Sequence, residues 1–348
     1  MFGVSRMPRA SPFSEMTTST TQSRTSAAVS SGVHAFLSGL IDYAGLFPPA
    51  RLSLDEAVPN YAAYQQSEDA WMLSRFICPA GRLRELSGYA ERFEPDTPLA
   101  VSVLGSGGSD ADAFLRALAA DLEAVQAFEN AHGARVQADL MEVRLPDAVV
   151  ETGSDSVASL LMQVGQLVAD AEVTFERVHF EAGFVGDWRR TVGGAVDALT
   201  RHSVKNGLAV GYKVRCGGVT ADAFPTPEQV AFVIARCRDA RLPFKATAGL
   251  HHPVRRFDHG IGAMMHGFLN VFGAGVLAHA LDLTEPAIRQ VLRNEAIKAF
   301  ALDEAGFAFQ DLRITPEQVA EARAALATSY GSCSFDEPRD DLRAAGLL

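Results

Sequence analysis

The chain has 348 residues, and 48% of them are hydrophobic, which is enough apolar material for a large buried core. Its 31 basic and 42 acidic side chains give a formal net charge of −11, which excludes the basic surface typical of nucleic-acid-binding proteins. No uninterrupted apolar run reaches the roughly eighteen residues of a membrane span, and the four cysteines form no CxxC pair that would indicate a disulfide framework or zinc ribbon.

The first 32 residues differ in composition from the rest of the chain. Thirteen of them are Ser or Thr, and Glu15 is the single acid. Such a segment cannot bury enough apolar surface to order itself, although its composition is also that of an organellar transit peptide. We interpret residues 1–32 as a disordered tail or the product of a misplaced start codon, and residues 33–348 as one domain.

The ordered part of the chain is predicted to begin with a helical extension. Helical apolar spacing covers Val33–Leu46, and Ser53–Glu56 forms the capping box of a second helix. Short β-type runs then alternate with amphipathic helical stretches. The predicted strands are Trp71–Cys78, Leu99–Leu104, Val136–Leu145, Arg177–Ala182, Leu208–Arg215 and Pro243–Ala248.

The spacing of these strands indicates the fold class. Successive strand starts lie about 28 to 41 residues apart, which is typical of βαβ units. A seventh strand near Gly267–Phe272 and an eighth near Ser329–Phe335 would close a (β/α)8 TIM-type barrel, irregular in these last two units. A doubly wound parallel sheet is the alternative, and the lack of a GxGxxG motif after the first strand disfavours it.

Four consecutive predicted strands end in polar residues two positions apart, which places each pair on one face of its strand. The pairs are Glu142 and Arg144, His179 and Glu181, Lys213 and Arg215, and Lys245 and Thr247. Catalytic residues of barrel enzymes gather at the carboxyl ends of the strands, so we predict that these pairs form an interior site. The alternative is that these side chains face outward towards the surrounding helices, where their charges would also be buried.

The charged members of these pairs predict the class of ligand. Two acidic and four basic side chains would make the interior net cationic, which favours a small anionic substrate held by Arg215 and Arg144. Gly217 and Gly218 follow the fifth of the predicted strands directly. Their backbone N–H groups would be available to the same anion.

Four of the nine histidines, His251, His252, His259 and His266, fall within sixteen residues, and three interpretations compete. In the first, Lys245 or Lys213 forms a Schiff base with a carbonyl substrate, and a histidine carries protons. In the second, His251 or His252 binds a divalent metal together with Glu181, Glu142 or His266. In the third, the histidines line a solvated loop without catalytic function.

The sequence leaves the roles of three further residues undetermined. Asn270 would face the site together with His266 if Gly267–Phe272 is a strand. Asp42, at the end of the first helix, would either plug one end of the barrel or reach the site. Cys333 would need a basic neighbour to act as a nucleophile, and the sequence does not show one.

Four segments resemble those of an uncharacterised bacterial protein family, over most of the chain from about residue 33. They are DYAGLFPPA (Asp42–Ala50), KVRCGG (Lys213–Gly218), FKATAGLHHP (Phe244–Pro253) and HGFLNVF (His266–Phe272). This resemblance implies no activity. A strand lysine followed by a glycine pair is also faintly similar to class I aldolase barrels such as deoxyribose-phosphate aldolase, and that similarity implies Lys213 or Lys245 as the Schiff-base lysine.

The sequence therefore predicts a cytoplasmic lyase or isomerase for a small anionic carbonyl compound, binding neither nucleic acid nor membrane. Lys245 or Lys213 would be the nucleophile, with acid–base work by Glu181, Glu142 and His251. One alternative is a metal-dependent hydrolase or lyase that uses the His251–His252 loop. The other is a non-catalytic barrel that binds a metabolite or a partner protein. No cofactor is predicted apart from the metal of the first alternative, and homo-oligomer formation is left open.

Overall fold

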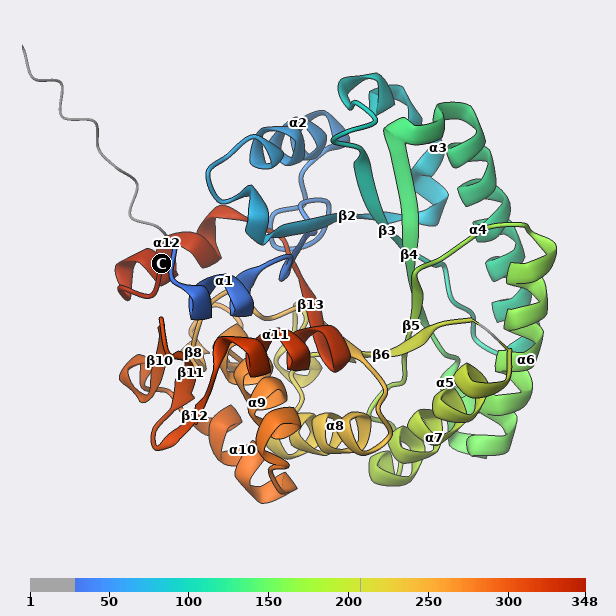
Figure 1. The fold of residues 1–348 in the computed structure, drawn as a ribbon. Helices are drawn as coiled ribbons and strands as arrows, with labels where there is room; N and C mark the ends of the chain where they lie inside the picture. The colour runs from blue at the N-terminus through green and yellow to red at the C-terminus, as the bar shows by residue number, and fades with distance from the viewer. Residues whose placement is uncertain (1–28, 207) are drawn as a thin grey trace, which may run out of the picture.

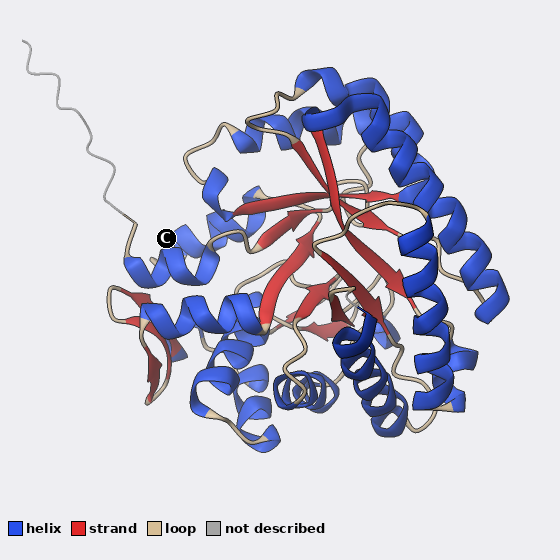
Figure 2. Cartoon of the chain, turned by 45° about the vertical axis from the view of Figure 1, so that its right-hand side comes forward, coloured by secondary structure: helices blue, strands red, loops and turns tan. Residues whose placement is uncertain are grey.

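Eight parallel strands close into a barrel, which confirms the predicted (β/α)8 architecture and rules out the open doubly wound sheet. The computed structural model describes residues 29–206 and 208–348. Figure 2 shows the strands as an inner ring with helices packed around them. The barrel strands are β1 (Ile41–Tyr43), β2 (Leu73–Pro79), β3 (Leu99–Leu104), β4 (Val136–Arg144), β5 (Arg177–Glu181), β6 (Val210–Arg215), β7 (Phe244–Thr247) and β13 (Ala327–Ser332).

Helices follow most of these strands, as the alternating pattern predicts (Figure 1). They are α1 (Ser31–Leu37), α2 (Leu54–Gln65), α3 (Leu83–Leu86), α4 (Ala111–His132), α5 (Asp147–Thr152), α6 (Ser154–Asp170), α7 (Trp188–Asn206), α8 (Pro227–Asp239), α9 (Phe268–Leu281), α10 (Glu285–Arg293), α11 (Pro316–Ala325) and α12 (Asp336–Ala344). The capping box predicted at Ser53 is present, since Glu56 accepts hydrogen bonds from the Ser53 N–H and hydroxyl. Within the described residues, no helix combines the length and apolar character needed to cross a membrane.

The prediction of a continuous helix over Val33–Leu46 is wrong. Helix α1 ends at Leu37, Gly39 adopts a left-handed conformation with φ of 56°, and β1 follows as the first strand of the barrel. A strand of three residues is too short to show alternation, so the helical spacing on either side concealed it. Residues 1–28 of the predicted tail lie outside the described residues, whereas Ser31 already belongs to α1.

The prediction of a strand near Gly267–Phe272 is also wrong, because this stretch begins α9, whose residues are buried on almost every side. A short helix that is apolar all round has no clear period, and periodicity alone cannot distinguish it from a buried strand. The predicted strand near Ser329–Phe335 overlaps β13 but begins and ends too late. The closing strand β13 pairs with β7 on one side and with β1 on the other.

Two antiparallel additions interrupt the βα repeat after β7. A hairpin, β8 (Arg256–Asp258) and β9 (Ala263–Met265), belongs to the loop above the barrel. A three-stranded sheet, β10 (Phe300–Asp303), β11 (Gly306–Phe309) and β12 (Leu312–Ile314), packs on α1, where Phe36 stacks on Phe307 with ring centroids 4.8 Å apart. Helix α1 is thus packed against a sheet whose strands lie more than 260 residues later in the chain.

Candidate active site

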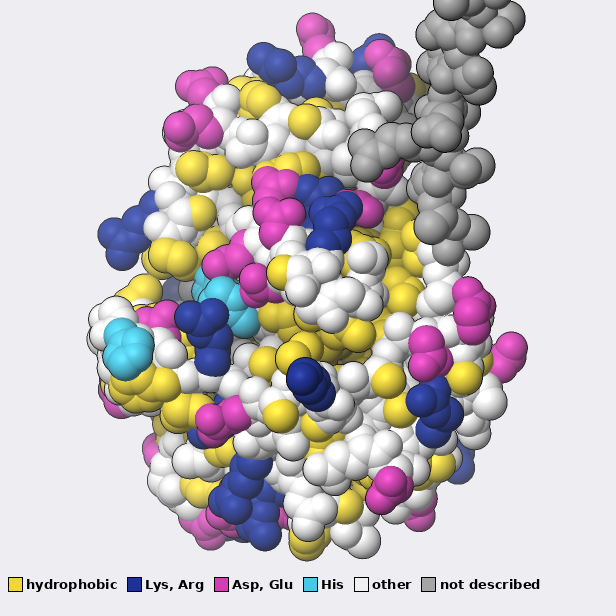
Figure 3. Space-filling view, turned by 90° about the vertical axis from the view of Figure 1, so that its left-hand side faces the viewer, with side chains coloured by type: hydrophobic (Ala, Val, Ile, Leu, Met, Phe, Trp, Pro, Cys, Tyr) yellow, Lys and Arg dark blue, Asp and Glu magenta, His cyan; other side chains and the backbone are white. Residues whose placement is uncertain are grey.

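A cavity of about 940 Å³ opens at the carboxyl ends of the barrel strands. This is the end at which barrel enzymes carry their active sites, and the volume suits a small-molecule ligand. Glu142 and Lys213 reach its floor from β4 and β6, whereas Arg215, Thr247 and Gly218 line it higher up. On the face that carries α12, histidine, acidic and basic side chains gather beside one another (Figure 3).

Below the cavity the barrel interior is filled by ions instead of the usual aliphatic layers. Lys213 Nζ lies 3.2 Å from Glu142 Oε2 and 3.2 Å from Glu181 Oε2. Lys245 Nζ donates to Asp42 Oδ2 at 2.9 Å and also contacts Glu142 Oε1. Glu142 therefore joins the two lysines, and all five side chains are almost completely buried.

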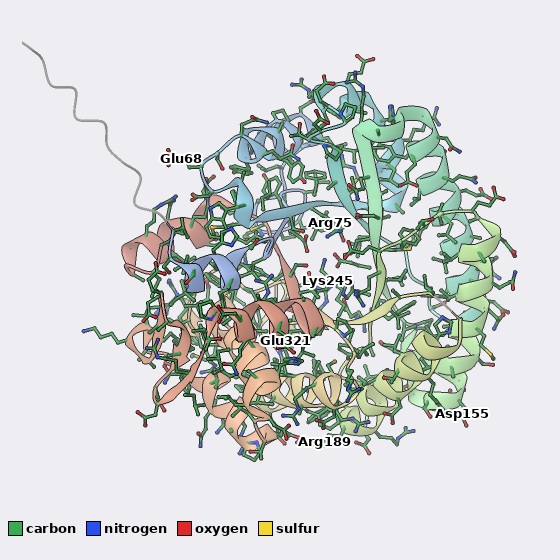
Figure 4. The ribbon with its side chains drawn as sticks, viewed as in Figure 1. Glu68, Arg75, Asp155, Arg189, Lys245 and Glu321 are labelled. Atoms are coloured by element: carbon green, nitrogen blue, oxygen red, sulfur yellow. The ribbon has the colours of Figure 1, made fainter. Side chains whose placement is uncertain are left out.

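Figure 4 shows that Lys245 and Arg75 point towards the centre of the barrel, whereas Asp155 and Arg189 lie at its periphery. The five buried side chains Asp42, Glu142, Glu181, Lys213 and Lys245 form an ionic column inside the barrel. Arg75 extends this column away from the cavity, since its Nε donates to Asp139 at 2.7 Å. Its backbone N–H donates to Asp42 at 3.0 Å. Asp42 therefore lies in the ionic column, where it contacts Lys245 instead of plugging one end of the barrel.

The net positive charge predicted for this interior is not found. Three cations, Lys213, Arg215 and Lys245, face three carboxylates, Asp42, Glu142 and Glu181. Asp42 is the acid that the strand pairs did not include. Arg144 lies outside the cavity, where Asp147 holds its guanidinium at 2.9 and 3.0 Å. Balance is expected physically, because an unpaired buried charge costs several kcal/mol.

The neighbours of Glu142 and Lys245 hold both groups in their charged forms. Burial alone would raise the pKa of Glu142, but Lys245 and Lys213 outweigh burial and hold that pKa well below its ordinary value. Burial alone would lower the pKa of Lys245, but Asp42 and Glu142 reverse this and raise it. Lys245 does not line the cavity, so a ligand bound there does not reach its Nζ.

His179 occupies the interior of β5 without a hydrogen-bond partner on either ring nitrogen among the described residues. Burial, together with the positive charge of Lys245, holds the pKa of His179 well below its ordinary value. The ring lies against Gly211 of β6, the register neighbour of His179, where no Cβ stands in the way. His179 is therefore a neutral imidazole packed inside the ionic column.

We expect Gly211→Ala to lower the free energy of unfolding by about 1–3 kcal/mol, because the added methyl group overpacks the interior. The new Cβ would lie 2.6 Å from His179 Cδ2 and 2.9 Å from the Pro243 carbonyl oxygen. Urea unfolding followed by circular dichroism measures the effect. The matched control is Gly81→Ala, whose Cβ would meet no atom within 4 Å, and a similar loss in both variants would contradict the packing argument.

At the rim of the cavity, His251 contacts two residues from the end of the chain. Its Nδ1 lies 3.3 Å from Glu337 Oε2 and 3.7 Å from Cys333 Sγ. The adjacent His252 has its Nδ1 2.6 Å from Asp341 Oδ2, and its Nε2 lies 4.0 Å from Glu337 Oε1. His251 is thus the basic neighbour of Cys333 that the sequence did not show, and the two residues lie more than 80 positions apart in the chain.

The contacts of His251 make stability depend on pH. Burial lowers the pKa of His251, but Cys333 and Glu337 outweigh it and raise the pKa to about 10. Because the folded-state pKa exceeds the ordinary value of 6.5, this stabilisation is fully present below pH 6.5 and is lost as the pH rises through about 10.

We expect Glu337→Gln to lower the pKa of His251, as measured from its Cε1–H NMR resonance. Asp341→Asn is the control, and equal shifts in both variants would contradict the pairing.

Other predicted site residues lie outside the cavity. Asn270 accepts a hydrogen bond from the Arg255 N–H and donates to the carbonyls of Val291 and Asn294, so its amide joins the loop after β7 to the end of α10. This position follows from the helical start of α9, and it offers no contact to a ligand in the cavity. Gly217 packs against Phe224, where a Cβ would lie 2.6 Å from the ring.

The residues predicted to bind a metal do not come together. His266 is buried, and its Nε2 lies 2.7 Å from the Pro225 carbonyl oxygen, apart from the partners of His251 and His252. In the described part of the chain, no three His, Cys, Asp or Glu side chains are arranged to hold a metal ion. The geometry therefore does not assemble the ligand set of His251, His252 and His266.

Sequence reasoning missed several members of the site. Ser102 donates to Glu142 at 2.7 Å and Ser329 donates to Asp42 at 2.6 Å. A lone serine within the apolar run of β3 was a usable signal, because it lies on the inward face. Glu337, on an exposed-looking acidic helix, carried no such signal.

No protein-family model and no curated protein matches the chain. The resemblance to an uncharacterised bacterial family therefore stays a prediction. Because barrels carry out many different reactions, the chemistry of the site is what bears on the function.

Proposed function

We propose that the cavity is the active site of a lyase or isomerase that binds a small carbonyl compound as a Schiff base on Lys213. The observation that carries this proposal is the place of Lys213 on the cavity floor, with its Nζ 3.2 Å from both Glu142 and Glu181. Of the two lysines that are buried among the described side chains, Lys213 lines the cavity and Lys245 lies beneath it. Lys245 thus serves to hold Glu142 and Asp42.

The charge balance of the site suits this chemistry. A lysine ammonium and a carbonyl compound give a protonated imine and water, so the positive charge on nitrogen is conserved. The carboxylates that pair with the ammonium would pair equally with the imine. To free the nitrogen lone pair, one proton passes to a carboxylate and returns to the carbinolamine hydroxyl, which leaves as water. Glu142 lines the cavity beside Lys213 and takes this role, while Glu181 holds Lys213 and Arg215 in place. The pKa of Glu142 rises as Lys213 gives up its proton, because the charge of Lys213 is one of the two that hold this pKa low.

Arg215 supports an anionic group on the substrate. Its Nε donates to Glu181 at 3.0 Å, and its two terminal nitrogens contact no acceptor among the described residues. The side chain lines the cavity, so these nitrogens are available as a fork for a carboxylate or phosphate. Arg215, and not the net charge of the balanced interior, therefore favours an anionic ligand.

Reductive trapping tests the proposal. The full-length protein is incubated with a panel of small keto acids, aldehydes and sugar phosphates in the presence of sodium cyanoborohydride, and adducts are mapped by peptide mass spectrometry. The chain contains four lysines, Lys205, Lys213, Lys245 and Lys298, so assignment is simple. We expect an adduct on Lys213, and Lys298→Ala, at an exposed position, serves as the control that keeps it.

The contrary outcomes are distinct. Labelling spread over the exposed Lys298 and the N-terminal amine, with none on Lys213, would contradict the Schiff base. A compound that binds and protects Lys213 but is never turned over would favour a metabolite-binding barrel instead. Turnover that depends on an added divalent metal and survives loss of Lys213 would favour the metal-dependent alternative.

A further inference from the structure

Cys333 differs in its surroundings from the other three cysteines. Cys78, Cys216 and Cys237 are buried in the apolar core, and burial raises their thiol pKa, to about 12 for Cys78 and Cys216. Cys333 follows β13 directly and lines the cavity. A probe that enters the cavity therefore reaches the sulfur of Cys333 before that of any core cysteine.

The sulfur of Cys333 belongs to a cluster contributed by three separate segments. His251, in the loop after β7, places Nδ1 3.7 Å from the sulfur, and Glu337 of α12 places Oε2 3.3 Å from the same nitrogen. A carboxylate beside an imidazole favours its protonated form, so His251 is placed to hold a proton next to the sulfur. The raised pKa of His251 agrees with this order of contacts. Cysteine, histidine and acid thus meet on the wall of the cavity, where all three line the open space.

We propose that Cys333 is a second nucleophile of this cavity, which His251 and Glu337 prepare for addition to small α,β-unsaturated carbonyl compounds. In the step, the sulfur lone pair forms an S–C bond at the β-carbon while the carbon–carbon π bond breaks. The electron pair moves to the carbonyl as an enolate, and the proton shared between Sγ and Nδ1 goes to the α-carbon. The product is a thioether, and no oxidant or reductant is consumed. The proposal does not depend on Lys213.

Labelling with N-ethylmaleimide, an unsaturated imide that reacts by this step, tests the proposal on the full-length protein at pH 7. Peptide mass spectrometry follows each cysteine over time. We expect Cys333 to be fully labelled before a tenth of any other cysteine has reacted, and Cys333→Ser to abolish this fast phase. His251→Ala and His251→Asn should slow the labelling of Cys333 at least tenfold, and Glu337→Gln should slow it several-fold.

The matched control is His252→Ala, which removes the adjacent histidine that contacts Asp341 at 2.6 Å and Glu337 at 4.0 Å instead of the sulfur. Its labelling rate should stay within twofold of the wild type. Circular dichroism establishes that each variant is folded before its rate is compared. Equal rates in the wild type and both His251 variants, or labelling of a core cysteine ahead of Cys333, would overturn the proposal.

Discussion

Replacement of Lys245 by methionine is expected to lower the free energy of unfolding by about 3–5 kcal/mol, because it removes one partner of a buried ion network. The variant leaves Asp42 with the Ser329 hydroxyl and the Arg75 N–H as its donors, and no cation within salt-bridge distance among the described residues. Glu142 is affected less, since Lys213 stays 3.2 Å away. Urea unfolding at pH 7 measures the loss.

Two further variants show whether the loss comes from the buried charge. Lys298→Met removes a lysine at an exposed position and should change stability by no more than about 0.5 kcal/mol. Adding Asp42→Asn to Lys245→Met should recover part of the stability, because the uncompensated carboxylate is then gone. A loss below about 1 kcal/mol in Lys245→Met, or no recovery in the double variant, would contradict the proposed role of the network.

Lys213→Arg is expected to abolish reductive trapping and to lower the turnover of a processed substrate at least ~10³-fold, as loss of a catalytic nucleophile does. Arginine keeps a positive charge between Glu142 and Glu181 but cannot form the imine. We therefore expect a stability loss of only about 1–3 kcal/mol, from the larger side chain. Trapping by mass spectrometry and steady-state kinetics give the two readouts.

The matched comparison for this prediction is Lys245→Arg. It makes the same chemical change one strand away, at a side chain that does not line the cavity. Trapping on Lys213 should persist in the folded Lys245→Arg variant. If Lys245→Arg abolished the adduct and Lys213→Arg retained it, the assignment of the nucleophile would be reversed.

The sequence by itself predicts the barrel and most of the buried ionic residues, for reasons that are local. The repeat of short β-type runs and amphipathic stretches follows from the periods of strand and helix. Side chains two apart on a strand share a face, and this rule groups the polar side chains at the strand ends. The sequence favours the inward face for Glu142, Glu181, Lys213 and Lys245, because active sites of barrels lie at the carboxyl ends of the strands. The two segments assigned to the wrong kind of element, at β1 and at α9, fall where a segment is too short or too uniformly apolar to show a period.

The partners of these residues were decided only by the tertiary structure. Asp42 meets Lys245 because β1 closes the barrel against β13, across more than 200 residues of chain. The same closure brings Cys333 and Glu337 to His251. Whether Lys213 or Lys245 faces the cavity depends on the depth of each side chain in the barrel, which the stagger of the strands sets. Local periodicity determines which face a side chain takes, but closure of the sheet determines what it meets there.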